Sequence, residues 1–501
     1  MKIDVIRLLI FTFLLVCSCS ENDYEDAVTI SGNIKGAENE HLFYTNPLKG
    51  TDMLLFKDST KIDSVGNYKI EIPLAQITQI TLQLPNTGRL SNNRLFRIIA
   101  EPNEKYIVNL PDSQSIGKNW FDVKSANNQV HYLINTFPQP LHPQETAGIY
   151  YQDSTASIII EKTEKAFYRE LSQLDSLMSR KEISKEVYDY IKKDREFYYT
   201  TQQATVGFVR FLMSERQPNI FNDDIKNMWS EALRKNLLNE PDFQRSMWGY
   251  YLAENKIIYE NFKQSNFDLK KFNEKIKDSS YLKFRFNSIE THLPEAIQEF
   301  CKASYIKMEL LQKDYQEELL HLYASFNSDF PRSPYLHYLK DDIHEVEAFQ
   351  KRAKELFVPG IEFVANHDEI ISFDSLLSEF NGQKLYVDIW GTWCGPCKQE
   401  FKHKDNLKRM LRKKEVVSLY ICESRSSKRE DWENMIKFYE LEGYHVFASN
   451  ELMSDIISKL GKKGSFYYPY YLLIDENGKV FKNEAARPSQ LEALKKQIEL
   501  F

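Results

Sequence analysis

The chain has 501 residues, more than one hydrophobic core normally supports, so we expect two to four domains. Acidic and basic residues nearly balance, with a formal net charge of −7 at pH 7, which argues against nucleic acid as the main partner. The hydrophobic share of 42% is ordinary for globular protein. Composition therefore indicates a multidomain globular protein and excludes a strongly basic nucleic-acid binder.

The first residues have the pattern of an export signal. A short basic start precedes an apolar run from Leu8 to Val16, which is too short for a permanent membrane-spanning helix. The following letters, VCSC, resemble a bacterial lipobox, in which a cysteine is lipidated after cleavage. We predict a lipoprotein signal peptide over residues 1–19 with Cys19 as the lipidation site. An ordinary signal peptide with incidental cysteines is the alternative.

Two regions of different texture follow. Residues 27–112 contain short alternating or β-branched runs separated by Gly, Asn, Pro and Asp, which predicts a small β-sandwich. Residues 127–356 are charged and amphipathic with few prolines or glycines, which predicts an all-α region. The β-rich region carries no cluster of His, Cys or carboxylates typical of a catalytic site, and the apolar stripes of the helical region indicate core.

One apolar stripe of the helical region indicates a single helical face. Its members recur at helical spacing: Met308, Leu311, Tyr315, Leu319 and Leu322. Another face includes Cys301, which we predict to be a buried core residue.

The last region, residues 358–501, alternates strands and helices and ends in a hairpin followed by a helix. Apolar runs LYVDIW, VVSLYIC and YHVFA predict strands, and ENG in YLLIDENGKVF predicts a hairpin turn. This order predicts a mixed sheet with helices on both faces. Cys422, at the end of VVSLYIC, is predicted to pack in the core.

The motif WCGPC places Cys394 and Cys397 where the strand LYVDIW gives way to a helix. A cysteine at a helix N-terminus favours the thiolate, with a pKa of roughly 3.5–7.5 against ~8.5 for a free thiol. Cys397, one turn further on, is expected to reach the first sulfur while shielded from solvent. A zinc site would need two more ligands, and the nearest histidines, His403 and His445, form no second paired motif. We interpret the pair as redox-active; a structural disulfide and a metal site are the alternatives.

The order of WGTWCGPC, Glu400, VVSLYICES and PYYLLIDENGKV resembles the TlpA/ResA-type branch of the thioredoxin superfamily, which comprises membrane-tethered thiol–disulfide oxidoreductases. The resemblance covers the chain from about Pro359 onward and implies a thioredoxin-like fold there. The β-rich N-terminal region is similar to modules that precede such domains in envelope lipoproteins.

The resemblance implies roles for individual residues. Cys394 corresponds to the nucleophile and Cys397 to the resolving cysteine. Asp388 corresponds to a buried acid that exchanges a proton with Cys397, and Glu400 to an acid that lines the active site. For both acids, an ordinary solvent-exposed carboxylate is the alternative.

Three further residues are expected to contact substrate. Trp393 corresponds to the aromatic residue that flanks the active site, and Pro469 to a cis-proline that faces the disulfide. Tyr468 departs from the family, which usually has a smaller or β-branched residue before that proline. Lys402 departs too, because relatives often have a proline at its position. These departures put substrate choice in doubt.

Together these features predict an exported, lipid-anchored thiol–disulfide oxidoreductase of the cell envelope, facing the periplasm, with the cell surface as the alternative. We expect it to reduce disulfides of client proteins and to receive electrons from a membrane thiol donor, without cofactor or metal. An oxidase or isomerase that uses the same cysteines is one alternative. A binding or scaffold lipoprotein with a vestigial thioredoxin domain is the other.

Overall fold

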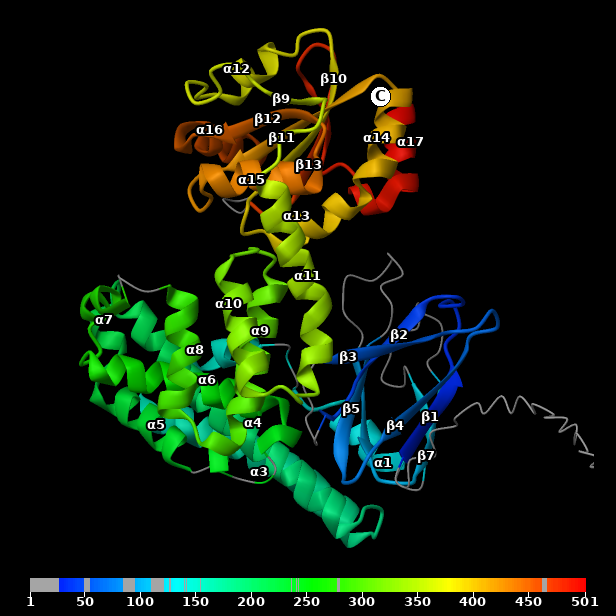
Figure 1. Cartoon of the computed structure of the whole chain (residues 1–501). Coiled ribbons are helices and arrows are strands. Elements are labelled where there is room, and N and C mark those ends of the chain that lie inside the picture. The colour runs from blue at the N-terminus through cyan, green and yellow to red at the C-terminus, as the bar shows by residue number, and fades with distance from the viewer. Residues whose placement is uncertain are drawn as a thin grey trace, which may run out of the picture.

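The computed structural model arranges the chain in three successive regions: strands, then helices, then a mixed α/β domain (Figure 1). The described residues are 27–48, 55–83, 95–109, 121–125, 128–138, 140, 142–153, 155–235, 237–239, 241, 243–276, 280–461 and 466–501. The predicted signal peptide, residues 1–19, and the predicted lipidation site Cys19 lie outside them. Within these ranges, no helix combines the length and the apolar character that crossing a bilayer requires.

The N-terminal region contains two four-stranded sheets. One has the order β4-β1-β7-β8, with β1 Ala27–Asn33, β4 Asn67–Pro73, β7 Lys105–Asn109 and β8 Asp122–Lys124. The other has the order β3-β2-β5-β6, with β2 His41–Thr45, β3 Lys57–Lys61, β5 Thr78–Gln83 and β6 Leu95–Ala100. The sequence of β4 explains why it forms a strand with one buried face, because exposed and buried side chains alternate along NYKIEIP. One buried cluster takes side chains from both sheets, among them Ile30 and Ile98.

The β-rich region extends past residue 112, where the sequence placed its end. Strand β8 pairs with β7, with Val108 opposite Val123, so the described strands reach Lys124. A three-residue strand is too short for its alternation to stand out in the sequence.

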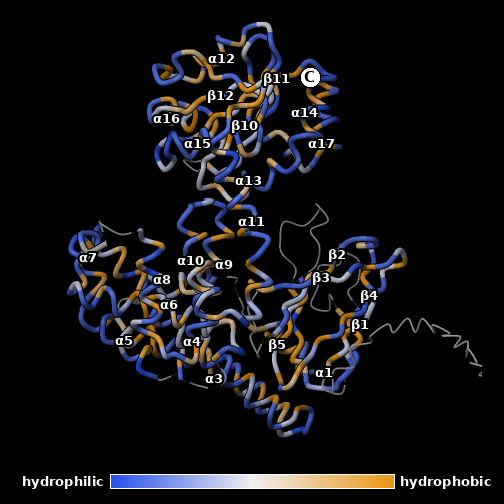
Figure 2. The backbone as a smooth tube through the Cα atoms, viewed as in Figure 1, coloured by the Kyte–Doolittle hydropathy of each residue, from blue (hydrophilic) through white to orange (hydrophobic). Residues whose placement is uncertain are grey.

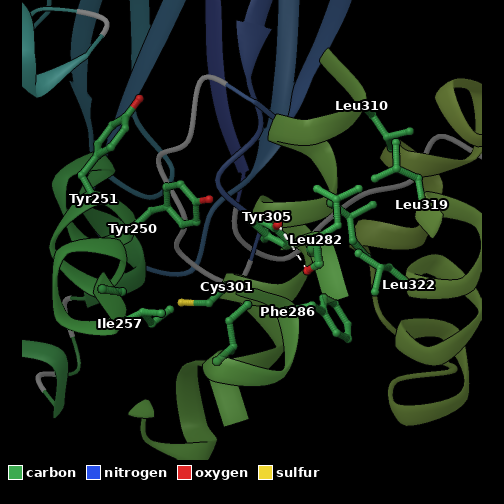
Figure 3. Close-up of a cluster of buried hydrophobic side chains, with 14 of the residues drawn as sticks. Tyr250, Tyr251, Ile257, Leu282, Phe286, Cys301, Tyr305, Leu310, Leu319 and Leu322 are labelled. Atoms are coloured by element: carbon green, nitrogen blue, oxygen red, sulfur yellow. Dashed lines mark hydrogen bonds between the residues drawn. The ribbon is translucent and has the colours of Figure 1, made fainter. Parts of the chain in front are cut away.

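The central region consists of helices. They are α1 Asn128–Ile134, α2 Pro143–Ala147, α3 Ala156–Ser179, α4 Lys185–Met213, α5 Asp223–Arg234, α6 Met247–Gln264, α7 Leu269–Ile276, α8 Tyr281–His292, α9 Glu295–Leu311, α10 Glu318–Asp329 and α11 Tyr335–Ala353. Short 3₁₀ turns lie at Gly148–Tyr150, Pro218–Ile220, Leu237–Asn239 and Phe243–Arg245. Cys301 is buried on α9 within an aromatic and aliphatic cluster (Figure 3), so its predicted place in the core is confirmed.

The predicted single helical face from Met308 to Leu322 is wrong. Helix α9 ends at Leu311 and α10 begins at Glu318, and residues 312–317 form a turn that we call the α9–α10 loop. Lys313 and Tyr315 have φ angles of 56° and 53°, which no α-helix accommodates. The apolar spacing misled because Tyr315 leaves the helix surface and packs partly on the C-terminal domain, where its ring contacts Phe438.

The C-terminal domain is built on a mixed sheet, as the sequence predicted, and this sheet has six strands. Its order is β14-β13-β10-β11-β12-β9, with β9 Ile361–Phe363, β10 Lys384–Trp390, β11 Val416–Glu423, β12 Gly443–Ala448, β13 Tyr470–Ile474 and β14 Val480–Asn483. Strands β9 to β12 run parallel to one another, β13 pairs antiparallel with β10, and β14 pairs antiparallel with β13 in a hairpin.

Helices cover both faces of this sheet. They are α12 Phe373–Ser378, α13 Gly395–Glu400, α14 Lys404–Lys413, α15 Arg429–Tyr439, α16 Asn450–Leu460 and α17 Leu491–Glu499, with 3₁₀ turns at Phe401–His403 and Pro488–Gln490. Strand β10 is buried on both sides: Val387 shares a cluster with α12 and α16, while Tyr386 shares one with α14 and α17. Asp388 therefore lies on the same face as Tyr386, because side chains alternate along a strand.

The helical region and the C-terminal domain share a continuous core. One buried cluster includes Phe349 of α11 and Tyr315 of the α9–α10 loop together with Trp390, Phe401 and Tyr439 of the C-terminal domain. Figure 2 shows hydrophobic residues gathered inside the regions and hydrophilic ones outside. Helix α13 lies at the side of the C-terminal domain that meets the helices (Figure 1).

Candidate redox site

Cys394 and Cys397 form a disulfide at the start of α13. Cys394 caps the helix: its Sγ accepts a hydrogen bond from the backbone N–H of Cys397 at 3.2 Å. Pro396 occupies the first turn, where a missing N–H costs little. The two cysteine Cα atoms are 5.3 Å apart, within the range that a disulfide needs. The chain thus presents a Cys-Gly-Pro-Cys pair that can close without moving the backbone.

Little of the disulfide is open to solvent. Cys394 is 3% exposed and Cys397 0%, so the predicted order of accessibility is present but the outer sulfur is itself buried. Trp393 is 43% exposed, contacts the ring of Tyr468 at a centroid distance of 5.2 Å, and donates its indole N–H to Glu423 at 3.0 Å. Attack on or by Cys394 therefore depends on the small part of this residue that solvent reaches.

Asp388 is buried, with 2% of its surface exposed, and its Oδ1 has no hydrogen-bond partner among the described residues. Burial raises the pKa of Asp388 well above its usual value, and the neighbouring charge of Glu400 raises it further. The side chain is therefore not a strand-end carboxylate in solvent. A buried carboxyl with a raised pKa is suited to proton exchange.

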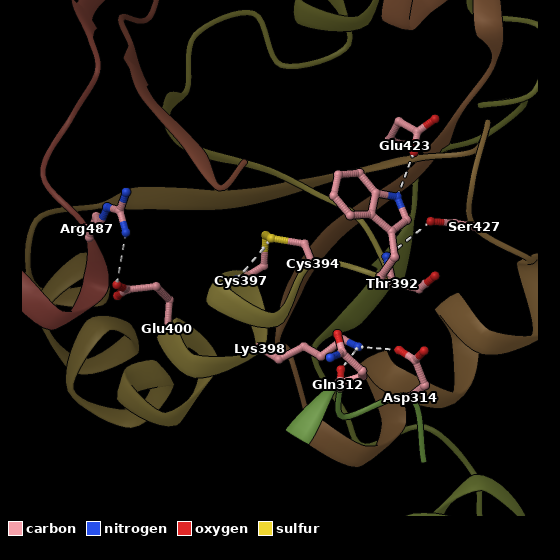
Figure 4. Close-up of a disulfide and its surroundings, with 11 residues drawn as sticks. Gln312, Asp314, Thr392, Cys394, Cys397, Lys398, Glu400, Glu423, Ser427 and Arg487 are labelled. Carbon is pink, nitrogen blue, oxygen red and sulfur yellow. Dashed lines mark hydrogen bonds and ion pairs between the residues drawn. A yellow bond between two sulfur atoms is a disulfide. The ribbon is translucent and has the colours of Figure 1, made fainter. Parts of the chain in front are cut away.

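Glu400 connects α13 to the turn before α17. Its carboxylate accepts hydrogen bonds from the backbone N–H of Ser489 at 2.9 Å and from the Ser489 hydroxyl at 3.0 Å. Arg487 lies 3.9 Å away (Figure 4). Glu400 is 8% exposed, so it is not a merely exposed glutamate. It holds the Pro488–Gln490 turn and places a negative charge near Asp388.

The peptide bond between Tyr468 and Pro469 is cis. Ile389 of β10 pairs with Tyr470 of β13, so Pro469 lies beside the end of β10 from which the chain runs to Cys394. The structure thus brings Pro469, Tyr468 and Trp393 to the same end of the sheet as the disulfide. Lys402 lies apart from them, exposed in the 3₁₀ turn after α13.

Sequence reasoning missed several neighbours of the disulfide. Lys398 follows Cys397 and is 1% exposed, yet nothing in the sequence marked it beyond its position. Ser427 accepts a hydrogen bond from the backbone N–H of Thr392 at 3.1 Å and so holds the loop before Cys394. Cys422 is buried as predicted and has a free thiol, whose pKa burial raises. In the described ranges, no three His, Cys, Asp or Glu side chains are grouped to hold a metal ion.

A six-stranded mixed sheet with a Cys-Gly-Pro-Cys disulfide at a strand-to-helix junction defines the class of thioredoxin-like dithiol domains. Comparison with known proteins agrees. The Redoxin family profile matches residues 373–498. Thiol-disulfide oxidoreductase ResA of Bacillus thuringiensis subsp. konkukian is 29% identical over 125 residues, 24% of this chain and 66% of that protein. ResA of Bacillus subtilis is 29% identical over 110 residues, 21% of this chain and 55% of that protein. Residues 373–498 thus match the Redoxin family profile, and this part of the chain is similar to ResA-type thiol-disulfide oxidoreductases.

The chain spans between 55% and 66% of the length of these two curated relatives. Among solved structures, the thioredoxin domain of a thiol-disulfide oxidoreductase from Bacteroides vulgatus is 22% identical, with 25% of this chain and 83% of that chain covered and a TM-score of 0.22. StoA of Bacillus subtilis is 22% identical, with 23% of this chain and 83% of that chain covered and a TM-score of 0.19.

Proposed function

We propose that this protein is a thiol–disulfide oxidoreductase that exchanges electrons with client proteins through Cys394 and Cys397. The observation that carries the proposal is the disulfide at the start of α13, with cis-Pro469 at the same end of the sheet and Asp388 buried on the face of β10 that α14 and α17 cover. The names of the ResA relatives support it.

The proposed reaction moves two electrons to the client. The Cys394 thiolate attacks one sulfur of a client disulfide, forms a mixed disulfide and releases the other client sulfur as a thiolate. Asp388 takes the proton of Cys397, and the Cys397 thiolate attacks Cys394. The second client sulfur leaves, and the Cys394–Cys397 disulfide forms. A raised pKa suits Asp388 to this step because it makes the carboxylate a stronger base.

The direction and the place of the reaction belong to the same proposal. Gly395 and Pro396 resemble the spacer of reducing thioredoxins, whose potential is about −270 mV, so we favour a reductase that a membrane thiol donor recharges. We also propose that the protein is exported, is held to a membrane by an acyl anchor at Cys19, and faces the periplasm. Exposure at the cell surface is the alternative. We also propose that the two N-terminal sheets form a β-sandwich module. A measured reduction potential of about −120 mV for the Cys394–Cys397 pair would instead indicate an oxidase.

Trapping of clients tests the division of labour between the two cysteines. Cys397→Ser leaves Cys394 free to attack but removes the resolving sulfur, so mixed disulfides should accumulate in non-reducing gels. Cys394→Ser should trap none of them. Cys422→Ser is the matched control, because it removes another buried thiol of the same core cluster and should neither trap clients nor slow turnover. Equal trapping by Cys394→Ser contradicts the proposal.

One observation favours the alternative of a binding or scaffold protein, namely the 3% exposure of Cys394. The two functions differ in what the reduced protein does at neutral pH. An oxidoreductase should react with iodoacetamide at Cys394 and reduce insulin disulfides. A scaffold with a vestigial domain should do neither, even after complete reduction of its dithiol.

A further inference from the structure

Lys398 connects the disulfide to the helical region. Its backbone N–H donates to the carbonyl oxygen of Cys394 at 3.2 Å, within the first turn of α13. Its side chain runs the other way, to the α9–α10 loop (Figure 4). One residue thus bonds to the outer cysteine through its backbone and to another region of the chain through its ammonium group.

The α9–α10 loop surrounds that ammonium with acceptors. Lys398 Nζ donates to the carbonyl oxygens of Gln312 at 2.9 Å and Lys313 at 3.0 Å, and to Oδ1 of Asp314 at 2.9 Å. These three bonds use all three protons that a lysine can donate. Burial lowers the pKa of Lys398, and Asp314 acts in the opposite direction. In the folded protein, the hydrogen bonds that water would make to the Lys398 ammonium group are therefore replaced by three acceptors of the helical region.

The loop is held in this shape from its own side. Lys313 and Tyr315 adopt positive φ angles of 56° and 53°, a conformation that non-glycine residues rarely adopt. The ring of Tyr315 stacks on Phe349 of α11 at a centroid distance of 4.7 Å, and its carbonyl accepts a hydrogen bond from Gln350 at 2.5 Å. Since the loop packs on α11, its three acceptors are held in fixed positions around the Lys398 ammonium group.

We propose that Lys398 is a positioning residue for the dithiol and that the α9–α10 loop, by holding Lys398, holds the first turn of α13 and with it Cys394. The helical region is then a structural part of the redox site. This proposal rests on the proposed oxidoreductase function, but its test measures the dithiol–disulfide equilibrium of the protein itself and needs no client.

The measurable consequence lies in the dithiol–disulfide equilibrium. A held first turn keeps the two sulfurs at a high effective concentration, which favours the disulfide over two thiols. Releasing the turn should lower the equilibrium constant for disulfide formation against glutathione by about fivefold. That change corresponds to a potential about 20 mV less negative, since tenfold is 29.6 mV.

The experiment compares the full chain with three variants: Lys398→Met, Asp314→Ala and Lys402→Met. Lys398→Met removes the ammonium but keeps the length of the side chain, and Asp314→Ala removes one acceptor from the loop. Lys402→Met is the matched control because Lys402 is exposed on the same helical stretch. We expect the first two variants to shift the glutathione equilibrium in the same direction and the control to match the wild type.

Two outcomes would overturn the proposal. If Lys398→Met and Asp314→Ala shift the equilibrium in opposite directions, then only their opposite charges act on the sulfurs. If both lower the melting temperature and leave the equilibrium unchanged, the contact is structural and positions nothing. Asp314→Ala keeps the test decisive should Lys398→Met fail to fold, because the Asp314 side chain is 43% exposed. If the wild type reduces no client, that result would contradict the proposed oxidoreductase function. It would leave the positioning role of Lys398 intact.

Discussion

The hydroxyl oxygens of Tyr315 and Tyr439 lie 2.6 Å apart and are buried. Tyr315 belongs to the α9–α10 loop and Tyr439 ends α15, so this hydrogen bond joins the helical region to the C-terminal domain. Tyr315 also donates to Glu345 of α11 at 2.8 Å. The hydrogen bonds among Tyr439, Tyr315 and Glu345 thus cross the interface between the two regions at the loop that binds Lys398.

Removal of either hydroxyl should weaken this interface. Tyr315→Phe removes the hydrogen-bond partner of the buried Tyr439 hydroxyl, which costs roughly 1–3 kcal/mol. Tyr439→Phe should cost less, because the Tyr315 hydroxyl still donates to Glu345. The double variant should cost less than the sum of the two, because neither orphaned hydroxyl remains. Urea unfolding followed by tyrosine and tryptophan fluorescence measures the three values. Tyr168→Phe, at a ring that is 62% exposed, is the control and should be neutral. Additive costs would contradict a direct coupling.

Asp388→Asn should change how stability depends on pH. Burial raises the pKa of Asp388 in the folded state above its unfolded value of about 3.9. The folded wild type therefore loses stability as pH rises from the unfolded pKa to the folded pKa. The asparagine cannot ionise, so the free-energy advantage of the variant should grow over that window by at most about 1.4 kcal/mol per pH unit. Parallel unfolding curves from pH 4 to 9 would contradict a buried, titrating Asp388.

The same variant should slow release of the client. If Asp388 takes the proton of Cys397, Asp388→Asn should slow decay of the mixed disulfide roughly 10²-fold at neutral pH, while attack by Cys394 changes little. Quenched-flow analysis of the mixed disulfide separates the two steps. An equal loss in both steps would mean that Asp388 acts only through the fold.

Glu400→Gln should move the titration of Asp388. The charge of Glu400 raises the pKa of Asp388, so its removal should lower that pKa, and the window in which Asp388→Asn gains stability should end at a lower pH. Comparing unfolding free energies of Glu400→Gln with and without Asp388→Asn measures the shift. Ser489→Ala is the control, because it removes one hydrogen bond to Glu400 and leaves the charge in place.

Cys301 and Cys422 should not react in the native protein. Both are buried, and burial raises the pKa of each thiol, so neither offers a thiolate at neutral pH. After reduction, alkylation with iodoacetamide and peptide mass spectrometry should label Cys394 and leave these two unmodified until denaturant is added. Native labelling of Cys422 at the rate of Cys394 would show that the domain opens around its core.

Local patterns in the sequence predicted the mixed sheet, its hairpin and the helix that follows the cysteines. The signals were short-range: apolar runs of strand length in LYVDIW and VVSLYIC, and a turn at Glu476–Gly478. The role of Asp388 came from the family resemblance, and the structure places this residue on the same face of β10 as Tyr386 and Trp390. These features depend on residues close to one another in the chain, and such spacing can be read without the fold.

The contacts between regions could not be read this way. Tyr315 fitted a helical stripe, yet it leaves the helix for Tyr439, and Lys398 gave no sign of its acceptors in residues 312–314. Glu400 likewise finds Ser489 only because α17 returns to the sheet beside α13 and α14. The amino-acid order by itself determined which residues are the candidates for redox chemistry. Only the tertiary structure decided what covers the disulfide and what holds it, because burial and ion pairing depend on segments far apart in the chain.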